Sequence, residues 1–268
     1  MERTSRASID RASLPRSRIG EPGPAGIRDS GYAVRFRHPA GAALRRPISV
    51  STFMTQPLTI DFVSDIACPW CAVGLSSLEL ALARLGDAVD AQIVVHPFEL
   101  NPQMGPGGEA IVDYLGKKYG STPEQIAETQ AMIRERGASV GFVFGPRTRV
   151  YNTFDAHRLL HWAGIEGNKQ LPLKLALLRA YHSEGKDPSD HGVLVEAAQS
   201  VGLDAEEARA VLQTGKYADE VRAEEENNQA MNIQSVPAII FNRRYLVSGG
   251  QPVDTFVQVI EQILAEAA

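Results

Sequence analysis

The stretch LTIDFVSDIACPWC, residues 58–71, ends in two cysteines with the spacing C-x-x-C. Its first six residues alternate between apolar and polar side chains and are rich in β-branched residues, which is typical of a strand. The leucines that follow recur at steps of three and four residues, as on one face of a helix. They are Leu75, Leu78, Leu82 and Leu85. Pro69 fits the first helical position, where its missing N–H group costs nothing, so the C-x-x-C is predicted at a strand–helix junction.

The rest of the chain predicts two more strand regions and a long helical stretch between them. Residues 91–98 form a predicted strand, and a predicted hairpin of 236–241 and 245–248 precedes a helix over 253–265. Candidate helices span 109–119, 123–137, 152–163, 170–184, 190–201, 204–213 and 216–231. The order predicts an α/β fold, β-α-β then β-β-α, with a large all-helical insertion. We expect one domain formed by 57–100 and 232–268, and a helical insertion domain at 101–231.

Residues 1–53 differ in composition from the remainder. They hold ten Arg, no Lys and four acidic residues, although the whole chain has a net charge of −5. They show no helical or strand periodicity and few large apolar residues, so we expect a disordered extension. Met54 is a candidate translation start, and an Arg-rich transit peptide is an alternative. The apolar segment of a secretory signal is missing, which favours a cytoplasmic protein.

Composition excludes several classes of protein. Hydrophobic residues make up 44% and charged residues 22% of the 268 residues, as in folded globular chains. Apolar runs fall short of the roughly 18 residues of a membrane span, so no membrane partner is predicted. The acidic net charge argues against nucleic acid as a partner. Two cysteines are too few for a disulfide framework or a four-cysteine zinc site.

Two thiols at a helix N-terminus suit reversible disulfide chemistry. The partial positive charge of the helix end stabilises a thiolate on the first cysteine. We therefore expect Cys68 to be the attacking nucleophile and Cys71 the resolving thiol. The dipeptide between them, Pro69 and Trp70, is expected to set the reduction potential. Trp70 is also expected to lie exposed beside Cys68, where it can contact a partner.

Other interpretations of the cysteine pair stay open at this level. Two imidazoles could complete a zinc site, and His96 and the i, i+4 pair His157 and His161 are the candidates. The cysteines could also be merely structural. Redox chemistry is favoured because the spacing, the strand–helix context and the cysteine count agree, and no metal is predicted.

A proline opens the third predicted strand. Pro237 in the trans form would fit poorly in a paired strand. A cis bond between Val236 and Pro237 would solve this and would turn the backbone of Val236 toward the thiols. We therefore place Pro237 next to the C-x-x-C.

Together these features resemble the DsbA family of thioredoxin-fold proteins, and its FrnE-like branch most closely. The motifs that carry the resemblance cover nearly all of residues 57–265. They are Ser64-Asp65-x-x-Cys68-Pro69-Trp70-Cys71, His96-Pro97-Phe98-Glu99-Leu100-Asn101-Pro102, Asn152-Thr153-x-x-Ala156-His157-Arg158-Leu159, Ala180-Tyr181-x-x-x-Gly185-Lys186-Asp187, Val236-Pro237 and Tyr245-x-Val247-Ser248-Gly249-x-Gln251-Pro252. The resemblance implies a thioredoxin fold with a helical insertion packed over the active site. It also implies thiol–disulfide exchange at Cys68 and Cys71 beside cis-Pro237.

Further residues are candidates for tuning the thiols or contacting substrate. They are Asp65, Val236, Asn152, His157 and Glu99. Asp65 lies three residues before the first cysteine and could shift the thiol pKa or relay protons, or be a solvated turn residue. Glu99 could instead cap a loop, Asn152 could cap a helix, and His157 could contact substrate. Glu224-Glu225-Glu226 is expected to form a solvated helix face.

The predicted function is that of a thiol–disulfide oxidoreductase whose cysteine pair is its own redox centre, without a bound cofactor. The expected partners are disulfide- or thiol-containing client proteins or glutathione, and a recycling redox partner. Thiols are kept reduced in the cytosol, so reduction or reshuffling of disulfides is favoured over their formation.

Two alternatives belong to other functional classes. One is a glutathione-dependent isomerase or transferase of the 2-hydroxychromene-2-carboxylate isomerase or kappa-class type, which shares the fold but uses Ser where this chain has Cys68. The other is a non-enzymatic chaperone with a groove for unfolded chains.

Overall fold

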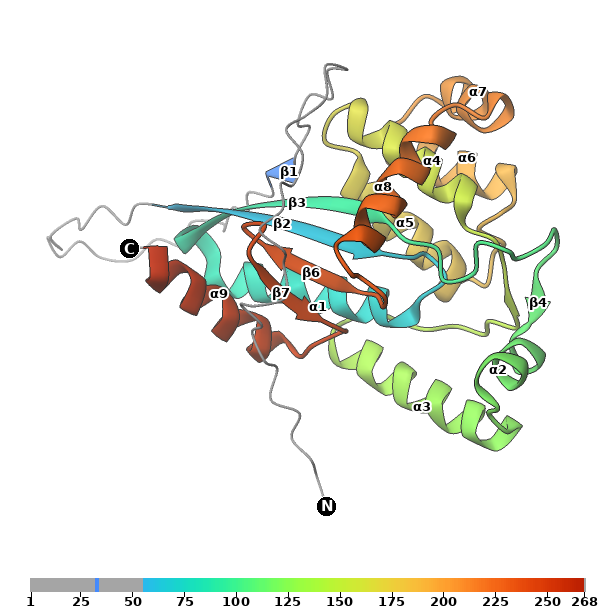
Figure 1. Ribbon diagram of the computed structural model, residues 1–268, viewed down its shortest axis with the longest axis horizontal. Coiled ribbons are helices and arrows are strands. Elements are labelled where there is room, and N and C mark those ends of the chain that lie inside the picture. Colours follow the sequence, from blue (N-terminus) through green and yellow to red (C-terminus); the bar gives the residue numbers. More distant parts are fainter. Residues whose placement is uncertain (1–31, 34–54, 268) are drawn as a thin grey trace, which may run out of the picture.

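The computed structural model describes residues 32–33 and 55–267, and its centre is a five-stranded sheet with the order β1-β3-β2-β6-β7. β2 and β3 are parallel, whereas β6 runs antiparallel to both β2 and β7. The elements of this unit are β2 (Gln56–Ser64), α1 (Pro69–Leu85), the 3₁₀ turn η1 (Gly86–Ala88), β3 (Val89–Pro97), β6 (Ala238–Phe241), β7 (Tyr245–Ser248) and α9 (Val253–Ala267). The arrangement confirms the predicted α/β fold with a helical insertion (Figure 1).

α1 and α9 cover one face of the sheet and enclose the larger hydrophobic core (Figure 1). We call it the sheet core; it includes Ile60 and Phe62 of β2, Leu78 of α1 and Phe256 of α9. Side chains alternate between the two faces of a strand, so the remaining strand residues point the other way. Val63 and Ile240 form a smaller buried cluster there with Ile233.

The helical insertion has a core of its own. Its elements are β4 (Glu109–Ala110), α2 (Ile111–Tyr119), α3 (Pro123–Ser139), β5 (Arg149–Val150), α4 (Phe154–Ile165), α5 (Gln170–His182), α6 (His191–Ser200), α7 (Ala205–Thr214) and α8 (Ala218–Ala230). The insertion core is built by α4 to α7 around residues such as Leu159, Leu177 and Leu194. Ile66 and Ala67, directly before the first cysteine, also belong to it. The chain that leads into the C-x-x-C therefore packs against the insertion.

α5 lies between the two cores. Leu171 and Leu178 pack into the sheet core, whereas Leu173 and Leu177 pack into the insertion core. Gln170, the first residue of α5, forms two hydrogen bonds to the main chain of Val95 on β3. Its side chain accepts from the Val95 N–H at 2.9 Å and donates to the Val95 carbonyl at 3.1 Å. Among the described residues, β1 pairs with β3 only at Gln92 and Ile93, so the outward main-chain groups of Val95 need another partner, and this contact fixes the insertion to the sheet.

Three local predictions are corrected by the structure. β4 and β5 pair with each other, whereas the sequence predicts a helix start and a loop there. α4 begins at Phe154 and not at residue 152, because the Asn152 side chain accepts the Phe154 N–H at 2.9 Å. Tyr32–Ala33, in the segment expected to be disordered, form β1 and pair with β3. The rest of residues 1–53, and Met54, lie outside the described residues.

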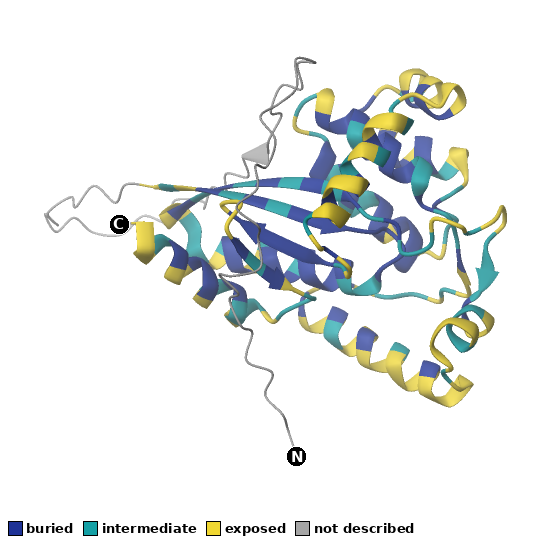
Figure 2. Ribbon diagram, in the orientation of Figure 1, coloured by how far each residue is buried: buried dark blue, intermediate teal, exposed yellow. Residues whose placement is uncertain are grey.

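Both the insertion and α9 carry exposed residues. Figure 2 shows α3 exposed along most of its length, while the strands and the inner helices are buried. None of the helices in residues 55–267 is both long enough and apolar enough to cross a bilayer.

A group of charged side chains joins the sheet to the insertion beside α8. Nε2 of His96 on β3 lies 3.0 Å from an oxygen of Asp61 on β2, and its Nδ1 lies 3.5 Å from Glu224 on α8. Nδ1 of His161 on α4 lies 2.8 Å from the same glutamate. Burial alone would lower the pKa of His96, but its two carboxylate partners outweigh this and raise the pKa to about 9. The expectation of a solvated face at Glu224 is therefore wrong.

We predict that this contact makes the folded state less stable at high pH. The pKa of His96 is raised above the value of about 6.5 for a free histidine, so its stabilisation is complete below pH 6.5 and is lost as pH rises through 9. His96→Gln should lower the free energy of unfolding at pH 6 by on the order of 2 kcal/mol, and much less at pH 9.5. Urea unfolding at both values measures this difference.

The matched control is His191→Gln, which removes an exposed histidine that contacts Asp155 at 2.7 Å. Exposed ion pairs contribute little, so this variant should unfold like the wild type at both pH values. An equal loss of stability for His96→Gln at pH 6 and pH 9.5 would contradict the interpretation.

Candidate active site

Cys68 occupies the N-cap position of α1, and Pro69 and Trp70 begin the helix. The Cys71 N–H donates to the Cys68 carbonyl at 3.1 Å, which closes the first turn. Both cysteines carry free thiols. The unpaired N–H groups of a helix start give this position a partial positive charge. The predicted position of the C-x-x-C between the first strand and the first helix is therefore confirmed.

The two thiols differ in exposure and in pKa. Cys68 is 5% exposed and Cys71 is 0% exposed. A hydrogen bond from the Cys71 thiol stabilises the Cys68 thiolate and, with the helix N–H groups, lowers the pKa of Cys68 despite its burial. Burial and the neighbouring Cys68 charge raise the pKa of Cys71 well above its usual value. The two thiols therefore differ: Cys68 has the lower pKa and keeps a slight exposure, whereas Cys71 is fully enclosed and has the higher pKa.

Pro237 lies beside the thiols, and the Val236–Pro237 peptide bond is cis, as the sequence analysis expects. The Cys68 thiol contacts the Val236 carbonyl oxygen at 3.5 Å. Two glycines allow this close approach: a Cβ on Gly74 would lie 3.1 Å from Cγ of Pro237, and a Cβ on Gly250 would lie 2.9 Å from the Trp70 carbonyl oxygen. Trp70 is half-buried against the sheet core, which corrects the expectation that it is exposed.

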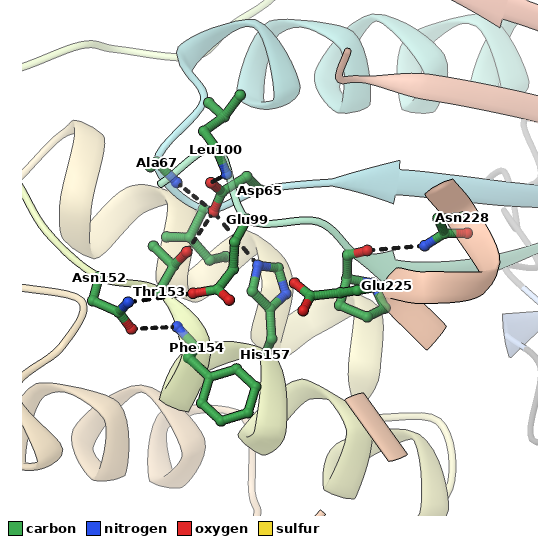
Figure 3. A network of polar contacts seen from close by, with 12 residues as sticks. Asp65, Ala67, Glu99, Leu100, Asn152, Thr153, Phe154, His157, Glu225 and Asn228 are labelled. Carbon is green, nitrogen blue, oxygen red and sulfur yellow. Dashed lines mark hydrogen bonds and ion pairs between the residues drawn. The ribbon is translucent and has the colours of Figure 1, made fainter. Parts of the chain in front are cut away.

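Asp65 is the centre of a buried polar network (Figure 3). It is 0% exposed, so it is not the solvated turn residue of the alternative interpretation. Its oxygens accept hydrogen bonds from the Ala67 N–H at 3.1 Å, the Leu100 N–H at 2.7 Å and the Thr153 hydroxyl at 2.7 Å. Burial alone would raise the pKa of Asp65, but His157 and the two main-chain donors outweigh it and lower the pKa.

The other predicted site residues surround Asp65 without reaching the surface beside the thiols (Figure 3). His157 is 2% exposed and its Nε2 lies 3.4 Å from Asp65, so in this structure it faces the buried carboxylate and not the surface. Asn152 donates to Glu99 at 3.3 Å and accepts the Phe154 N–H at 2.9 Å just before α4, whose N-cap residue is Thr153. Glu99 is buried and paired with Arg222 of α8.

The histidines considered as zinc ligands have other partners. His96 and His161 contact Glu224, and His157 contacts Asp65. Among residues 32–33 and 55–267, no group of three or more Cys, His, Asp or Glu side chains is arranged to hold a metal ion.

Two side chains of the insertion form hydrogen bonds to the segment before Cys68. The sequence analysis does not identify either of them. Nε2 of His182 donates to the Ile66 carbonyl at 2.8 Å, and Arg147 donates to the Ala67 carbonyl at 3.2 Å. Arg147 also lies 3.4 Å from Nδ1 of His182, which therefore accepts. Burial and the Arg147 charge keep the pKa of His182 well below its usual value, so its ring stays neutral.

Lys174 of α5 is a third residue that the sequence analysis misses. It is 0% exposed, and its Nζ has no hydrogen-bond partner among the described residues. Burial lowers its pKa to about 8, although the charges of Cys71 and Asp65 act in the opposite direction. A signal for it does exist, because Lys174 interrupts the apolar positions between Leu171 and Leu178 of the helix.

Comparison with known proteins places this geometry in a family. Residues 59–261 match the DSBA-like thioredoxin domain family. The chain belongs to that family. A thioredoxin fold with a helical insertion and a thiol–disulfide oxidoreductase function in the general sense follow from this membership.

Three proteins are similar to this chain at different levels of sequence identity. A probable DsbA oxidoreductase from Streptomyces coelicolor is 36% identical with a TM-score of 0.73, over 78% of this chain and 91% of that one. The uncharacterised protein YwbO of Bacillus subtilis is 27% identical over 75% of this chain and 94% of its own length. The cytosolic disulfide reductase DsbM from Pseudomonas aeruginosa, solved with glutathione, is 19% identical with a TM-score of 0.53. The match covers 76% of this chain and 98% of that one. This last likeness shows the fold alone.

We predict that Asp65 restrains the acidity of the nucleophile. The negative charge of Asp65 raises the pKa of Cys68, so Asp65→Asn should lower the Cys68 pKa. The rate of iodoacetamide alkylation, followed between pH 4 and 9 in a Cys71→Ser background, measures this pKa. The variant should also be less stable, by about 1–3 kcal/mol, because an amide cannot accept all three hydrogen bonds.

Thr153→Val is the matched control. It removes one hydrogen bond to Asp65 but keeps the carboxylate charge, so it should destabilise the fold without lowering the Cys68 pKa. If both variants shift the Cys68 pKa equally, the effect of Asp65 is structural and not electrostatic.

Proposed function

We propose that this protein exchanges disulfides with client proteins or glutathione through Cys68, with Cys71 as the resolving thiol. The observation that carries the proposal is the asymmetry of the pair. Cys68 is the more exposed of the two thiols, at 5%, and has a lowered pKa, whereas Cys71 is fully enclosed and donates to it. This is the arrangement that a nucleophile and its resolving partner require.

The proposed exchange proceeds in two displacements. The Cys68 thiolate attacks one sulfur of a client disulfide, the client S–S bond breaks, and the departing client thiolate takes a proton. Cys71 then loses its proton and attacks Sγ of Cys68, which releases the second client thiol and forms the Cys68–Cys71 disulfide. The client gains two electrons and the cysteine pair loses two, and the reverse sequence oxidises a client.

Val236 and Pro237 are proposed to receive the client backbone. The Val236 carbonyl lies 3.5 Å from the Cys68 thiol, so a client segment bonded to Cys68 would run along this main chain. A Cβ on Gly74 would lie 3.1 Å from Cγ of Pro237, so this glycine lets α1 pack closely against the same main chain. Trp70, half-buried beside this position, would contact the apolar side chains of the client.

We propose a cytoplasmic location, net reduction or isomerisation of disulfides, and recycling by glutathione or another dithiol donor. A reducing compartment keeps such pairs in the dithiol form. We also assign the chain to the FrnE-like branch, on the motifs of residues 64–71, 96–102 and 152–159. Disulfide exchange is preferred to a glutathione-dependent isomerisation because a resolving thiol such as Cys71 has no role in the latter.

We predict that single cysteine variants separate the two displacements. With glutathione disulfide, Cys71→Ser should accumulate one glutathione on Cys68, since the resolving thiol is gone. Cys68→Ser should remain unmodified, since Cys71 is 0% exposed. The wild type should pass to an intramolecular disulfide. Intact-protein mass spectrometry after acid quench distinguishes the three products.

The proposal fails if Cys71→Ser stays unmodified while denatured protein reacts, because Cys68 would then not be a nucleophile. It also fails if glutathione accumulates on Cys71 in Cys68→Ser, because the assignment of attacking and resolving thiols would be reversed.

A further inference from the structure

Arg147 brings a guanidinium group of the insertion close to the first cysteine. It lies in the segment between α3 and β5, which passes the start of α1 (Figure 1). Its terminal nitrogen Nη1 donates to the Ala67 carbonyl at 3.2 Å. Ala67 is bonded to Cys68, so standard bond lengths limit the distance from this nitrogen to Cα of Cys68 to about 7 Å. A fixed positive charge therefore lies within reach of a small molecule or peptide that is bonded to the Cys68 sulfur.

One end of this guanidinium is held by the protein, and the other is open. Nη1 also lies 3.4 Å from both the Tyr181 hydroxyl and Nδ1 of His182, and the group lies over the Tyr181 ring at 5.1 Å from its centre. Every nitrogen of a guanidinium donates, yet Nε and Nη2 have no hydrogen-bond partner among residues 32–33 and 55–267. Neither of these two nitrogens is enclosed. The contacts at Nη1 thus orient the group and leave its other edge accessible.

The open edge of Arg147 has the form of a carboxylate-binding fork. Nε and Nη2 lie side by side in the guanidinium plane, and such paired donors bind the two oxygens of a carboxylate. The neighbouring Arg149 uses the same two nitrogens on the carbonyls of Gly107 and Gly108, so its fork is occupied. The fork of Arg147 has no such use within the described chain, which indicates a ligand from outside it.

We propose that Arg147 binds a carboxylate group of the disulfide that Cys68 attacks, and so makes the protein selective for acidic disulfides. The inference rests on the proposed function and names its substrate class. The carboxylate belongs either to glutathione or to an acidic side chain beside the client disulfide, and the recognition is the same. The bonds that form and break are those of the first displacement, and Arg147 stays protonated throughout. Its contribution is to hold the disulfide in place for attack.

The test compares two small disulfides that differ in charge. 3,3′-Dithiodipropionate ends in carboxylates, and bis(2-hydroxyethyl) disulfide ends in neutral hydroxyls. Each is mixed with Cys71→Ser protein, in which attack by Cys68 leaves one adduct, and adduct formation is followed by intact-protein mass spectrometry after acid quench. The readout is the ratio of the two rate constants. Any change in the Cys68 thiolate itself, including one caused by the lost Ala67 contact, acts on both reactions and cancels in the ratio.

We expect Arg147→Gln to lower the ratio of carboxylate to hydroxyl disulfide at least about tenfold, because a hydrogen bond between two charged groups is lost. Arg147→Lys should keep part of the preference, since it retains the charge but not the fork. A residue that only supports the segment before Cys68 would slow both reactions equally and leave the ratio as it is.

Arg149→Gln is the matched control. It removes the same charge from an exposed arginine two positions along the chain, so it should leave the ratio as it is in the Cys71→Ser parent. An unchanged ratio in Arg147→Gln would overturn the inference, and so would an equal fall in Arg149→Gln, because the effect would then be one of net charge.

Two further arms identify the source of the carboxylate. One uses glutathione disulfide, and the other uses a disulfide-linked peptide with blocked ends and an aspartate beside its cysteine, compared with the same peptide carrying asparagine. Selective slowing in Arg147→Gln supports the inference in either arm and names glutathione or an acidic client segment, respectively. Slowing in neither arm would overturn it. If the Cys71→Ser parent formed no adduct with any of these disulfides, the proposed function would fail, which is distinct from an unchanged ratio.

Discussion

The burial of the short segment between β2 and Cys68 is the constraint on which the site depends. Ile66 and Ala67 pack into the insertion core, while β2 and α1 on either side belong to the sheet core. A buried segment must satisfy its polar groups. Asp65 takes two main-chain donors and Thr153, and the insertion supplies His182 and Arg147 to the free carbonyls. The helical insertion is thus part of the active site and not an appendage to it.

This placement makes two chemically identical thiols behave differently. The helix start and the Cys71 hydrogen bond favour charge on Cys68, and enclosure opposes it on Cys71. Enclosure protects the resolving thiol from reacting with unintended disulfides, but it also disfavours the thiolate form that attacks Cys68. Lys174, fully buried on α5, the helix that joins the two cores, is one of the groups whose charge acts on Cys71.

The sequence predicts the features that depend on local pattern. The strand, the C-x-x-C and the first helix turn follow from spacing, and cis-Pro237 follows from the conflict between proline and a paired strand. Contacts between distant segments could not be predicted in this way. Glu224, Arg147 and His182 look like ordinary surface residues in a helical pattern or loop, and only tertiary packing buries them or pairs them. Lys174 is detectable in the sequence as a charge among leucines, but its complete burial is not.

The most direct test of the account is a redox titration of the cysteine pair. The wild-type protein is equilibrated in glutathione buffers of graded potential, quenched with acid, alkylated and weighed by mass spectrometry. We predict that both thiols disappear together in one two-electron transition, with no stable glutathione adduct along the way. A protein that carries glutathione on Cys68 beside a free Cys71 at every potential would contradict the account, because Cys71 would then not resolve.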